Sequence, residues 1–326
     1  MSPITIVGAG PAGCAAALAV LREGRSPRIF EKSPFPRHKV CGEFLSPETA
    51  AILEELGAGS ASQELKAARL ARIHLFLGSS EKKWSLPEPA WGVSRFALDH
   101  LLLSHAVRNG AEMIREPAAD PHSPVILAHG RHEPSRRGPR LFGFKAHFRG
   151  PIDDSVDLFF FSNCYVGVSA VEAGNTNVCG LAPENLLRAS KFEIEPVLSR
   201  SAPLWRRLNG LTRTMDWLIT GPLIFRDYFH SSPQEGRYPA GDALGFVDPF
   251  TGSGILAALL TGRMAGLAAA RSIPAAEHVR ECRKVLLRQY EVAGVLRRAI
   301  QSGAAEWLAP WIPGRWLFQL TRPRLC

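Results

Sequence analysis

The sequence predicts an α/β protein with a parallel-sheet domain, an inserted antiparallel β-sheet domain and a C-terminal helical segment. Three observations predict this fold. The first stretch alternates strand, helix and strand patterns, which is typical of a parallel sheet covered by helices. The stretch from residue 139 to residue 235 contains short strand patterns separated by turn residues. A second glycine-rich turn after residue 240 then leads into a long alanine- and leucine-rich helix.

The first stretch carries a glycine motif between a strand and a helix. An apolar run at residues 4–7 enters Gly8-x-Gly10-x-x-Gly13, and a second strand ends at Glu31. Gly8 lets the chain turn, Gly10 lets backbone approach a pyrophosphate, and Gly13 lets the helix pack closely on the strand. A carboxylate about 20 residues further on can accept hydrogen bonds from both ribose hydroxyls of an adenosine, and it argues against a 2′-phosphate. The pattern predicts a Rossmann-like dinucleotide-binding unit.

Composition limits the other possibilities. The 326 residues suggest about two domains, and 46% hydrophobic with 21% charged residues describe a soluble globular protein. No apolar run reaches the ~18 residues of a membrane-spanning helix. Six scattered cysteines without C-x-x-C pairs predict a reducing cytoplasm and no zinc module. We therefore expect a cytoplasmic protein without a metal.

The net charge of +9 requires an anionic partner or ligand. Three classes fit this charge: nucleic acid, an anionic membrane surface, and an anionic ligand such as a phosphorylated cofactor. No nucleic-acid motif accompanies the dispersed arginines, so we expect no nucleic-acid partner. The basic stretch 131–140 is interpreted as a surface loop, with a weaker possibility that it binds a nicotinamide phosphate.

A loop rich in proline and glycine follows the second strand, at residues 33–47. It carries two cations, Arg37 and Lys39, and the thiol of Cys41 close to where the far end of a dinucleotide would lie. The alternative is a solvated connection. A helix with Ser94 as its cap comes later, and Arg95 in its first turn is either a ligand contact or simply exposed.

The central stretch predicts the wall of a substrate pocket. Strand patterns occur at residues 69–77, 82–86, 141–148, 156–161, 165–171, 176–181 and 223–227, with an amphipathic helical region at 183–209. Lys145 and His147 would share one face of a strand, since their spacing is two residues. These two side chains are expected to face either a ligand or water.

The second informative motif begins at Gly241-Asp242. Gly241 permits close approach of backbone, and Asp242 can accept hydrogen bonds from sugar-like hydroxyls. Asp248-Pro249 and a short glycine-containing turn follow, and the free N–H groups of the next helix would stabilise developing negative charge.

Together these motifs resemble the FAD-dependent oxidoreductases that include aromatic hydroxylases, geranylgeranyl reductases and flavin-dependent halogenases. The resemblance runs from residue 4 to about residue 270, with a gap in the middle. It implies that the first motif and its acid hold the ADP half of FAD, that Gly241 and Asp242 hold the ribityl chain, and that the Asp-Pro turn lies at the isoalloxazine. The cofactor contacts that it implies are Gly8, Gly10, Pro11, Ala12, Gly13, Glu31, Lys32, Arg37, Lys39, Gly42, Arg95, Gly241, Asp242, Gly252, Ser253, Gly254 and Ile255.

The loop around Cys41 is most similar to the reductase branch of this family, whose Lys-x-Cys-Gly segment places a cysteine near flavin and an isoprenoid substrate. The resemblance therefore implies catalytic positions at Cys41, Asp248 and Pro249, although Cys41 could equally be a small buried filler. Three departures matter. The Asp-Gly motif of the hydroxylases is His129-Gly130 here, and the segment 115–125 is too short for the β-strands that commonly precede that motif. A halogenase tryptophan motif is absent, so halogenation is not expected, and Gly167 stands where reductases often have tryptophan.

The predicted function is that of an FAD-dependent oxidoreductase, a monooxygenase or reductase. Reduced flavin would act on a lipophilic or aromatic small molecule by hydroxylation or double-bond reduction, with NADPH or NADH as a transient electron donor. The alternative is a flavin-binding protein with a non-redox role, such as an isomerase or cyclase. The expected division is an FAD-binding domain at 1–68, 93–138 and 236–282, a substrate domain at 69–92 and 139–235, and a C-terminal helical segment at 283–326.

The C-terminal segment interleaves tryptophan with apolar residues between residues 307 and 318 and ends among arginines. Such a segment predicts either peripheral contact with a membrane surface or a lid over the substrate domain.

Overall fold

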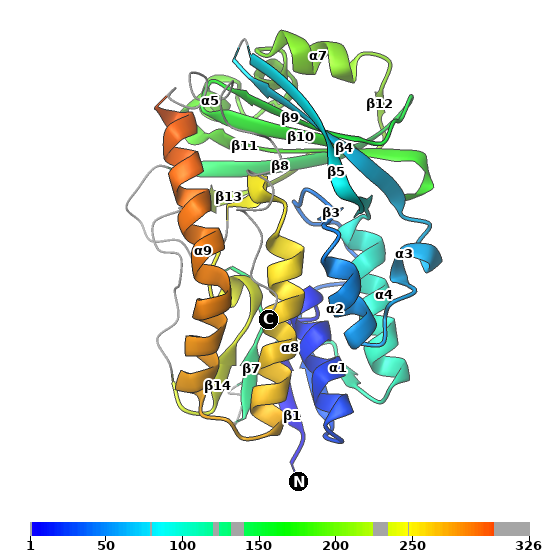
Figure 1. The fold of residues 1–326 in the computed structure, drawn as a ribbon, viewed down its shortest axis with the longest axis vertical. Coiled ribbons are helices and arrows are strands. Elements are labelled where there is room, and N and C mark those ends of the chain that lie inside the picture. The colour runs from blue at the N-terminus through cyan, green and yellow to red at the C-terminus, as the bar shows by residue number, and fades with distance from the viewer. Residues whose placement is uncertain are drawn as a thin grey trace.

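A computed structural model describes residues 2–78, 80–119, 124–131, 140–223, 234–246 and 248–302. These residues form two β sheets, which lie one above the other along the long axis of the molecule (Figure 1). The predicted α/β fold class is confirmed. The Trp-rich segment between residues 307 and 318 lies outside the described residues, so its predicted role stays a prediction.

The first sheet is parallel and has the strand order β14-β7-β1-β2-β6 among the described residues. Its strands are β1 (Ile4–Val7), β2 (Pro27–Phe30), β6 (Glu112–Ile114), β7 (Val125–Leu127) and β14 (Arg237–Pro239). In chain order the two halves wind outward from β1, which is the doubly wound arrangement with a switch point beside β1. A ligand is therefore expected at the carboxyl ends of these strands.

Two helices pack closely beside this sheet, α1 (Pro11–Arg22) and α8 (Gly254–Ala270). A Cβ on Gly262 would lie 2.2 Å from the Ala12 carbonyl oxygen, and one on Gly266 would lie 2.4 Å from that of Ala16. Because these positions lack side chains, the backbones of α1 and α8 lie close together. The helix that follows the second glycine motif therefore packs against the helix that follows the first. Helix α4 (Arg95–Arg108) follows the predicted cap, because the Ser94 hydroxyl accepts the N–H of Ala97 at 3.1 Å.

The second sheet contains nine of the described strands in the order β12-β8-β11-β10-β9-β4-β5-β3, with β13 also pairing with β8. It is antiparallel as predicted except between β4 and β9, which run parallel. Between β5 and β8 the chain forms α4, β6 and β7. This excursion through the first sheet allows β9 to pair with β4 in the parallel direction. Its strands are β3 (Phe44–Leu45), β4 (Ala68–Leu77), β5 (Ser80–Gly92), β8 (Leu141–Arg149), β9 (Ser155–Phe161), β10 (Cys164–Ala170), β11 (Asn175–Pro183), β12 (Thr212–Arg213) and β13 (Leu218–Leu223).

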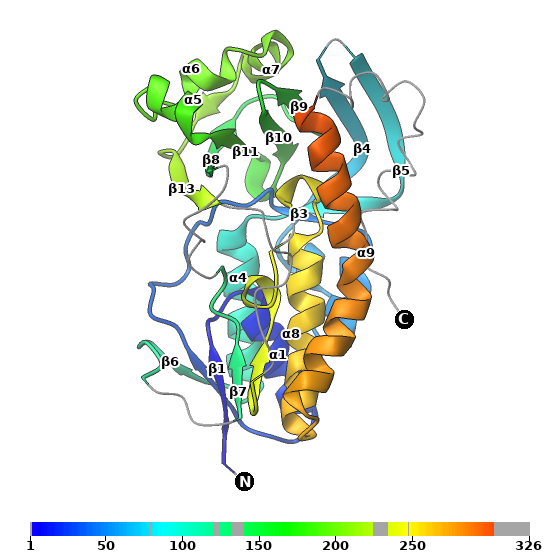
Figure 2. The ribbon, with the colours of Figure 1, turned by 90° about the vertical axis from the view of Figure 1, so that its left-hand side faces the viewer.

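The region predicted as helical at 183–209 is three short helices, α5 (Glu184–Ala189), α6 (Glu195–Leu198) and α7 (Ala202–Leu208). Lys191 and Phe192 have positive φ, which ends α5 and separates it from α6. These helices lie on the face of the second sheet turned away from the first sheet (Figures 1 and 2). Of the strand expected at 223–227, only Leu223 is described, as the last residue of β13, and residues 224–233 lie outside the described part.

The remaining described elements are helices and 3-10 turns outside the two sheets. They are α2 (Thr49–Glu55), α3 (Ala61–Glu64), the 3-10 turns η1 (Glu172–Gly174), η2 (Gly241–Ala243) and η3 (Pro249–Thr251), and α9 (Ala275–Gln301). Helix α9 runs beside α8 and reaches the second sheet (Figure 2), where Ile300 packs against Leu77 and Phe160. Within the described residues, we find no helix with the length and apolar character needed to span a bilayer.

Candidate cofactor and substrate site

The turn between β1 and α1 is shaped by three glycines. Gly8 has a φ of +105°, and a Cβ there would lie 2.4 Å from the Ala128 carbonyl oxygen. A Cβ on Gly13 would lie 1.8 Å from the carbonyl oxygen of Gly8. Around Gly10, by contrast, a Cβ would meet only an Arg95 guanidinium nitrogen, at 3.6 Å. Two glycines therefore permit the turn itself, whereas Gly10 leaves backbone open to a ligand.

Glu31 lies beside this turn at the end of β2, and its side chain is buried. It accepts hydrogen bonds from the backbone N–H groups of Ala9 at 3.2 Å and Ser33 at 2.9 Å, and from the Arg37 guanidinium at 3.0 Å. Burial alone would raise the pKa of Glu31, but these donors outweigh it and hold the pKa below its ordinary value. Glu31 is thus an anion, and a ribose hydroxyl would compete with Arg37 for its oxygens.

Arg95 is held in place by a carboxylate one helical turn away. Its Nε and one terminal nitrogen donate to the two carboxylate oxygens of Asp99, at 2.6 and 2.7 Å. Its side chain is only 13% exposed, so the alternative of a merely exposed first-turn arginine is wrong. Asp99 was not among the predicted site residues, although an acid four residues after an arginine on a predicted helix is a recognisable signal.

Three cations lie close enough to influence one another beside the glycine turn. Burial lowers the pKa of Lys39, and the charges of Arg95 and Arg37 lower it further. Burial would also lower the pKa of Arg95, but the Asp99 carboxylate outweighs it and raises the pKa above its ordinary value. Like charges gathered beside an open glycine favour an anion. The arrangement suits a pyrophosphate.

The second glycine motif, which begins at Gly241, also lies beside the start of α1. Gly241 has a φ of +59°, and a Cβ there would lie 3.0 Å from the Ala12 Cβ at the start of α1. Its N–H donates to the Thr261 hydroxyl of α8 at 2.9 Å. Arg131 begins the basic stretch 131–140, of which residues 132–139 lie outside the described part, and its guanidinium lies 5.9 Å from the centre of the Phe246 ring. Burial lowers the pKa of Arg131, and the charge of Asp242 opposes that shift, which places the two side chains near each other.

The turn before α8 is tied to α9. Asp248 is buried and ion-paired with Arg297 at 3.4 Å. The Ser253 hydroxyl is also buried, where it contacts the Thr251 hydroxyl at 2.7 Å and accepts from the Gln289 side-chain amide. Ser253 could therefore contact a cofactor through its backbone but not through its hydroxyl. Sequence reasoning missed both α9 residues because nothing along the chain links them to this turn.

The loop that carries Cys41 lies between this turn and the second sheet. A Cβ on Gly252 would lie 3.0 Å from the Phe44 ring, and one on Gly143 of β8 would lie 3.0 Å from Val40. The Asn177 amide on β11 donates to the Cys41 carbonyl at 3.0 Å. Burial raises the pKa of the partly buried Cys41 thiol, while the charge of Arg95 opposes the increase. The thiol is therefore protonated at neutral pH.

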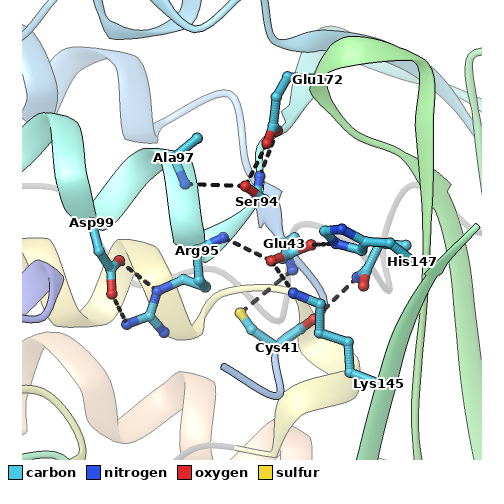
Figure 3. Close-up of polar contacts among 10 residues, drawn as sticks. Cys41, Glu43, Ser94, Arg95, Ala97, Asp99, Lys145, His147 and Glu172 are labelled. Atoms are coloured by element: carbon cyan, nitrogen blue, oxygen red, sulfur yellow. Dashed lines mark hydrogen bonds and ion pairs between the residues drawn. The ribbon is translucent and has the colours of Figure 1, made fainter. Parts of the chain in front are cut away.

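Lys145 and His147 are buried, so the alternative that they face water is wrong, whereas a ligand on this face stays a prediction. They bind the carboxylate of Glu43, two residues after Cys41 (Figure 3). The His147 Nε2 lies 2.7 Å from one Glu43 oxygen, and the Lys145 ammonium donates to the other. Glu43 and Lys145 are fully buried. An acid within an otherwise basic loop was the available signal for Glu43.

The other predicted contacts are distributed as follows. Pro11, Ala12 and Ile255 are buried in α1 and α8, and Gly254 is the first residue of α8. Pro249 begins η3. Lys32 and Gly42 are exposed, and nothing in the structure brings Lys32 to the glycine turn. The residues that do meet fit FAD, because an open glycine backbone, neighbouring cations and a carboxylate that can accept from a ribose gather beside the turn between β1 and α1.

No family model matches the chain. A menaquinone reductase of Mycobacterium tuberculosis is 36% identical over 137 residues, which cover 41% of this chain and 32% of that protein. This chain thus aligns with about a third of the length of that curated relative. The structure is also similar to flavin-dependent brominase Bmp2, with a TM-score of 0.78, 17% identity and coverage of 98% of this chain and 92% of that one.

This chain has the fold of an FAD-dependent oxidoreductase. The resemblance found in the sequence is confirmed. A geranylgeranyl bacteriochlorophyll reductase-like protein of Thermoplasma acidophilum shares the fold as well, with a TM-score of 0.72, 17% identity and coverage of 99% of this chain and 92% of that one. Both the halogenase and the reductase branches named in the sequence analysis therefore have this architecture.

Proposed function

We propose that this protein is an FAD-dependent oxidoreductase that reduces a double bond in a lipophilic small molecule. The observation that carries the proposal is the place of Cys41, on a loop packed between the turn before α8 and the second sheet. The sequence relative named a menaquinone reductase and the geranylgeranyl reductase-like structure support reduction.

The cofactor would lie against the residues already described. The Gly8 to Gly13 turn and Arg95 would hold the pyrophosphate, Glu31 the adenosine ribose, and Gly241 with Asp242 the ribityl chain. Bound FAD would supply reversible two-electron transfer, with NADPH or NADH as the transient donor. The N-terminal N–H groups of α8 would stabilise negative charge at the flavin ring. The division into an FAD-binding and a substrate domain at the predicted boundaries remains part of this proposal.

The substrate would lie against an apolar part of the second sheet. Register places Leu158 opposite Gly167, and Gly167 opposite Cys179, which itself faces Lys145. These residues share one face of the sheet, and on the same face Phe160 stacks on Tyr165 with 5.9 Å between ring centres. Leu77 and Ile300 extend this apolar cluster. Such a wall suits an apolar chain or ring and disfavours a highly charged substrate.

The test begins with FAD titration of the purified chain, followed by anaerobic addition of NADPH or NADH and then of menaquinone. We expect the yellow absorbance to bleach with the nicotinamide and to return on addition of menaquinone, with a product that has lost a double bond. A Glu31→Gln variant should bind FAD about tenfold more weakly, because it keeps the shape and removes the ribose acceptor's charge.

Other outcomes separate the alternatives. Rapid return of the yellow absorbance in air with a hydroxylated product would replace reduction by monooxygenation. Flavin that binds but changes no substrate's oxidation state would favour the non-redox alternative. Failure to bind FAD at all would overturn the proposal.

A further inference from the structure

The Glu43 carboxylate joins three segments that are far apart in the sequence. Its own loop carries Cys41, and its oxygens accept from the Arg95 backbone N–H at 2.7 Å, from Lys145 and from His147. Arg95 begins α4, whereas Lys145 and His147 belong to β8. Figure 3 shows the carboxylate between Arg95 at the start of α4 and Lys145 and His147 of β8. Glu43 thus connects the cofactor side of the molecule with the sheet proposed to hold substrate.

The backbone conformation of Glu43 indicates that tertiary contacts hold this residue in place. Glu43 has a φ of 55°, a left-handed conformation that is unfavourable for a residue with a side chain. Its N–H approaches the Cys41 sulfur at 3.4 Å, and its carbonyl accepts the N–H of Val93 at 3.0 Å. The backbone and the side chain of Glu43 therefore both fix the segment that presents the thiol.

A metal ion is the obvious competing explanation, because His38, Glu43 and His147 offer ligand atoms within 4.8 Å of one another. The Lys145 ammonium already binds the same carboxylate, and a divalent cation beside it would be repelled. His38 instead stacks on Phe96, with 4.9 Å between ring centres. The cluster is better explained as a set of compensating charges than as a cation site.

We propose that Glu43 is a positioning residue, which fastens the cysteine loop to β8 through Lys145 and His147 and so sets the orientation and charge environment of the Cys41 thiol. The inference rests on the proposed function only in giving Cys41 a role beside the substrate. The geometry of the cluster stands independently of that role.

The charged and titratable groups around the thiol come from each packed element. Arg95 on α4 and Lys145 on β8 are positive, Glu43 in the loop is negative, and Cys179 on β11 is a neutral thiol whose pKa burial raises further. Removal of the Glu43 charge should favour the thiolate of Cys41. Removal of the Lys145 charge should disfavour it.

The experiment measures the rate at which iodoacetamide alkylates Cys41, as a function of pH, in the full-length protein with and without FAD. Peptide mapping by mass spectrometry assigns the modified cysteine, and thermal unfolding followed by circular dichroism confirms that each variant is folded. At a pH below the thiol pKa, Glu43→Gln should raise the rate severalfold and Lys145→Met should lower it severalfold. Glu43→Asp, which keeps the charge, should restore a rate close to wild type.

A matched control is Glu184→Gln, because Glu184 also forms ion pairs, with Arg140 and Arg188, but does so on α5. It should leave the Cys41 rate unchanged. If the cluster only holds the fold together, both cluster variants would loosen the loop and raise the rate, and that common direction would overturn the proposal. Unchanged rates in both would overturn it as well.

The alkylation experiment remains decisive if a variant does not fold or if the flavin reaction is not observed. If Lys145→Met does not fold, the rates of Glu43→Gln and Glu43→Asp decide, since equal rates in those two variants would contradict an electrostatic role. Thiol reactivity does not depend on flavin chemistry. A protein that never bleaches with NADPH or NADH but shows opposite rate changes would thus refute the proposed reaction and leave the positioning role supported.

Discussion

The glycine turn and the Glu43 cluster both fix the backbone near the proposed cofactor site, but they do so in different ways. The turn depends on missing side chains, and the cluster depends on paired charges. In the turn, missing side chains let Gly13 approach Gly8 and leave Gly10 open. In the cluster, Glu43 and Lys145 are brought together from positions 102 residues apart, and each buried charge compensates the other. The glycine turn therefore depends mainly on residues that are close in sequence, whereas the Glu43 cluster depends on tertiary structure. This difference determines how each should respond to substitution.

The largest effect should come from breaking the cluster on one side. Lys145→Met leaves the buried Glu43 carboxylate with fewer donors and should lower the free energy of unfolding by about 3–5 kcal/mol. The double variant Glu43→Gln with Lys145→Met removes both charges and should be clearly more stable than Lys145→Met alone. Urea denaturation measures both, and equal losses in the single and double variants would show that the two residues do not depend on each other.

The turn should respond to added volume and not to charge. Gly13→Ala places a methyl group against the carbonyl of Gly8 and should lower the free energy of unfolding by about 2–3 kcal/mol. Gly10→Ala meets only the end of the Arg95 side chain, so its stability should stay close to wild type while FAD affinity falls. Urea denaturation and FAD titration of both variants sharpen the contrast, which similar stability losses in the two variants would break.

The smallest effect should be a dependence on acid. Burial would raise the pKa of Glu43, but the His147 hydrogen bond and the Lys145 charge outweigh it, so its folded pKa lies below its ordinary value. Glu43 therefore contributes stability that is present above its unfolded pKa of about 4.3 and is lost as pH falls through the lower folded value. We expect unfolding free energy to fall in this acid range, less steeply in Glu43→Gln. A slope unchanged by that substitution would contradict the prediction.

The sequence predicted the turn because its residues are near one another along the chain and each has a distinct stereochemical task. Asp99 was accessible in the same way, through helical spacing. The partners of Glu43 could not be predicted in this way. The alternation in β8 places Lys145 and His147 on one face of the strand but does not show which residue covers that face. Gln289 and Arg297 lie on a helix whose pattern indicates an amphipathic surface but not its neighbour.

The parallel pair within the second sheet has a consequence for how the chain reaches its native state. β4 and β9 pair through residues such as Arg72 and Ser155, and the chain between them builds α4, β6 and β7 of the other sheet. Each sheet is built from segments separated in sequence by segments of the other, which gives a high contact order and predicts slow folding. Gene fragments cut between the two sheets would release incomplete edges prone to aggregation, so the protein should be expressed and dissected as one unit.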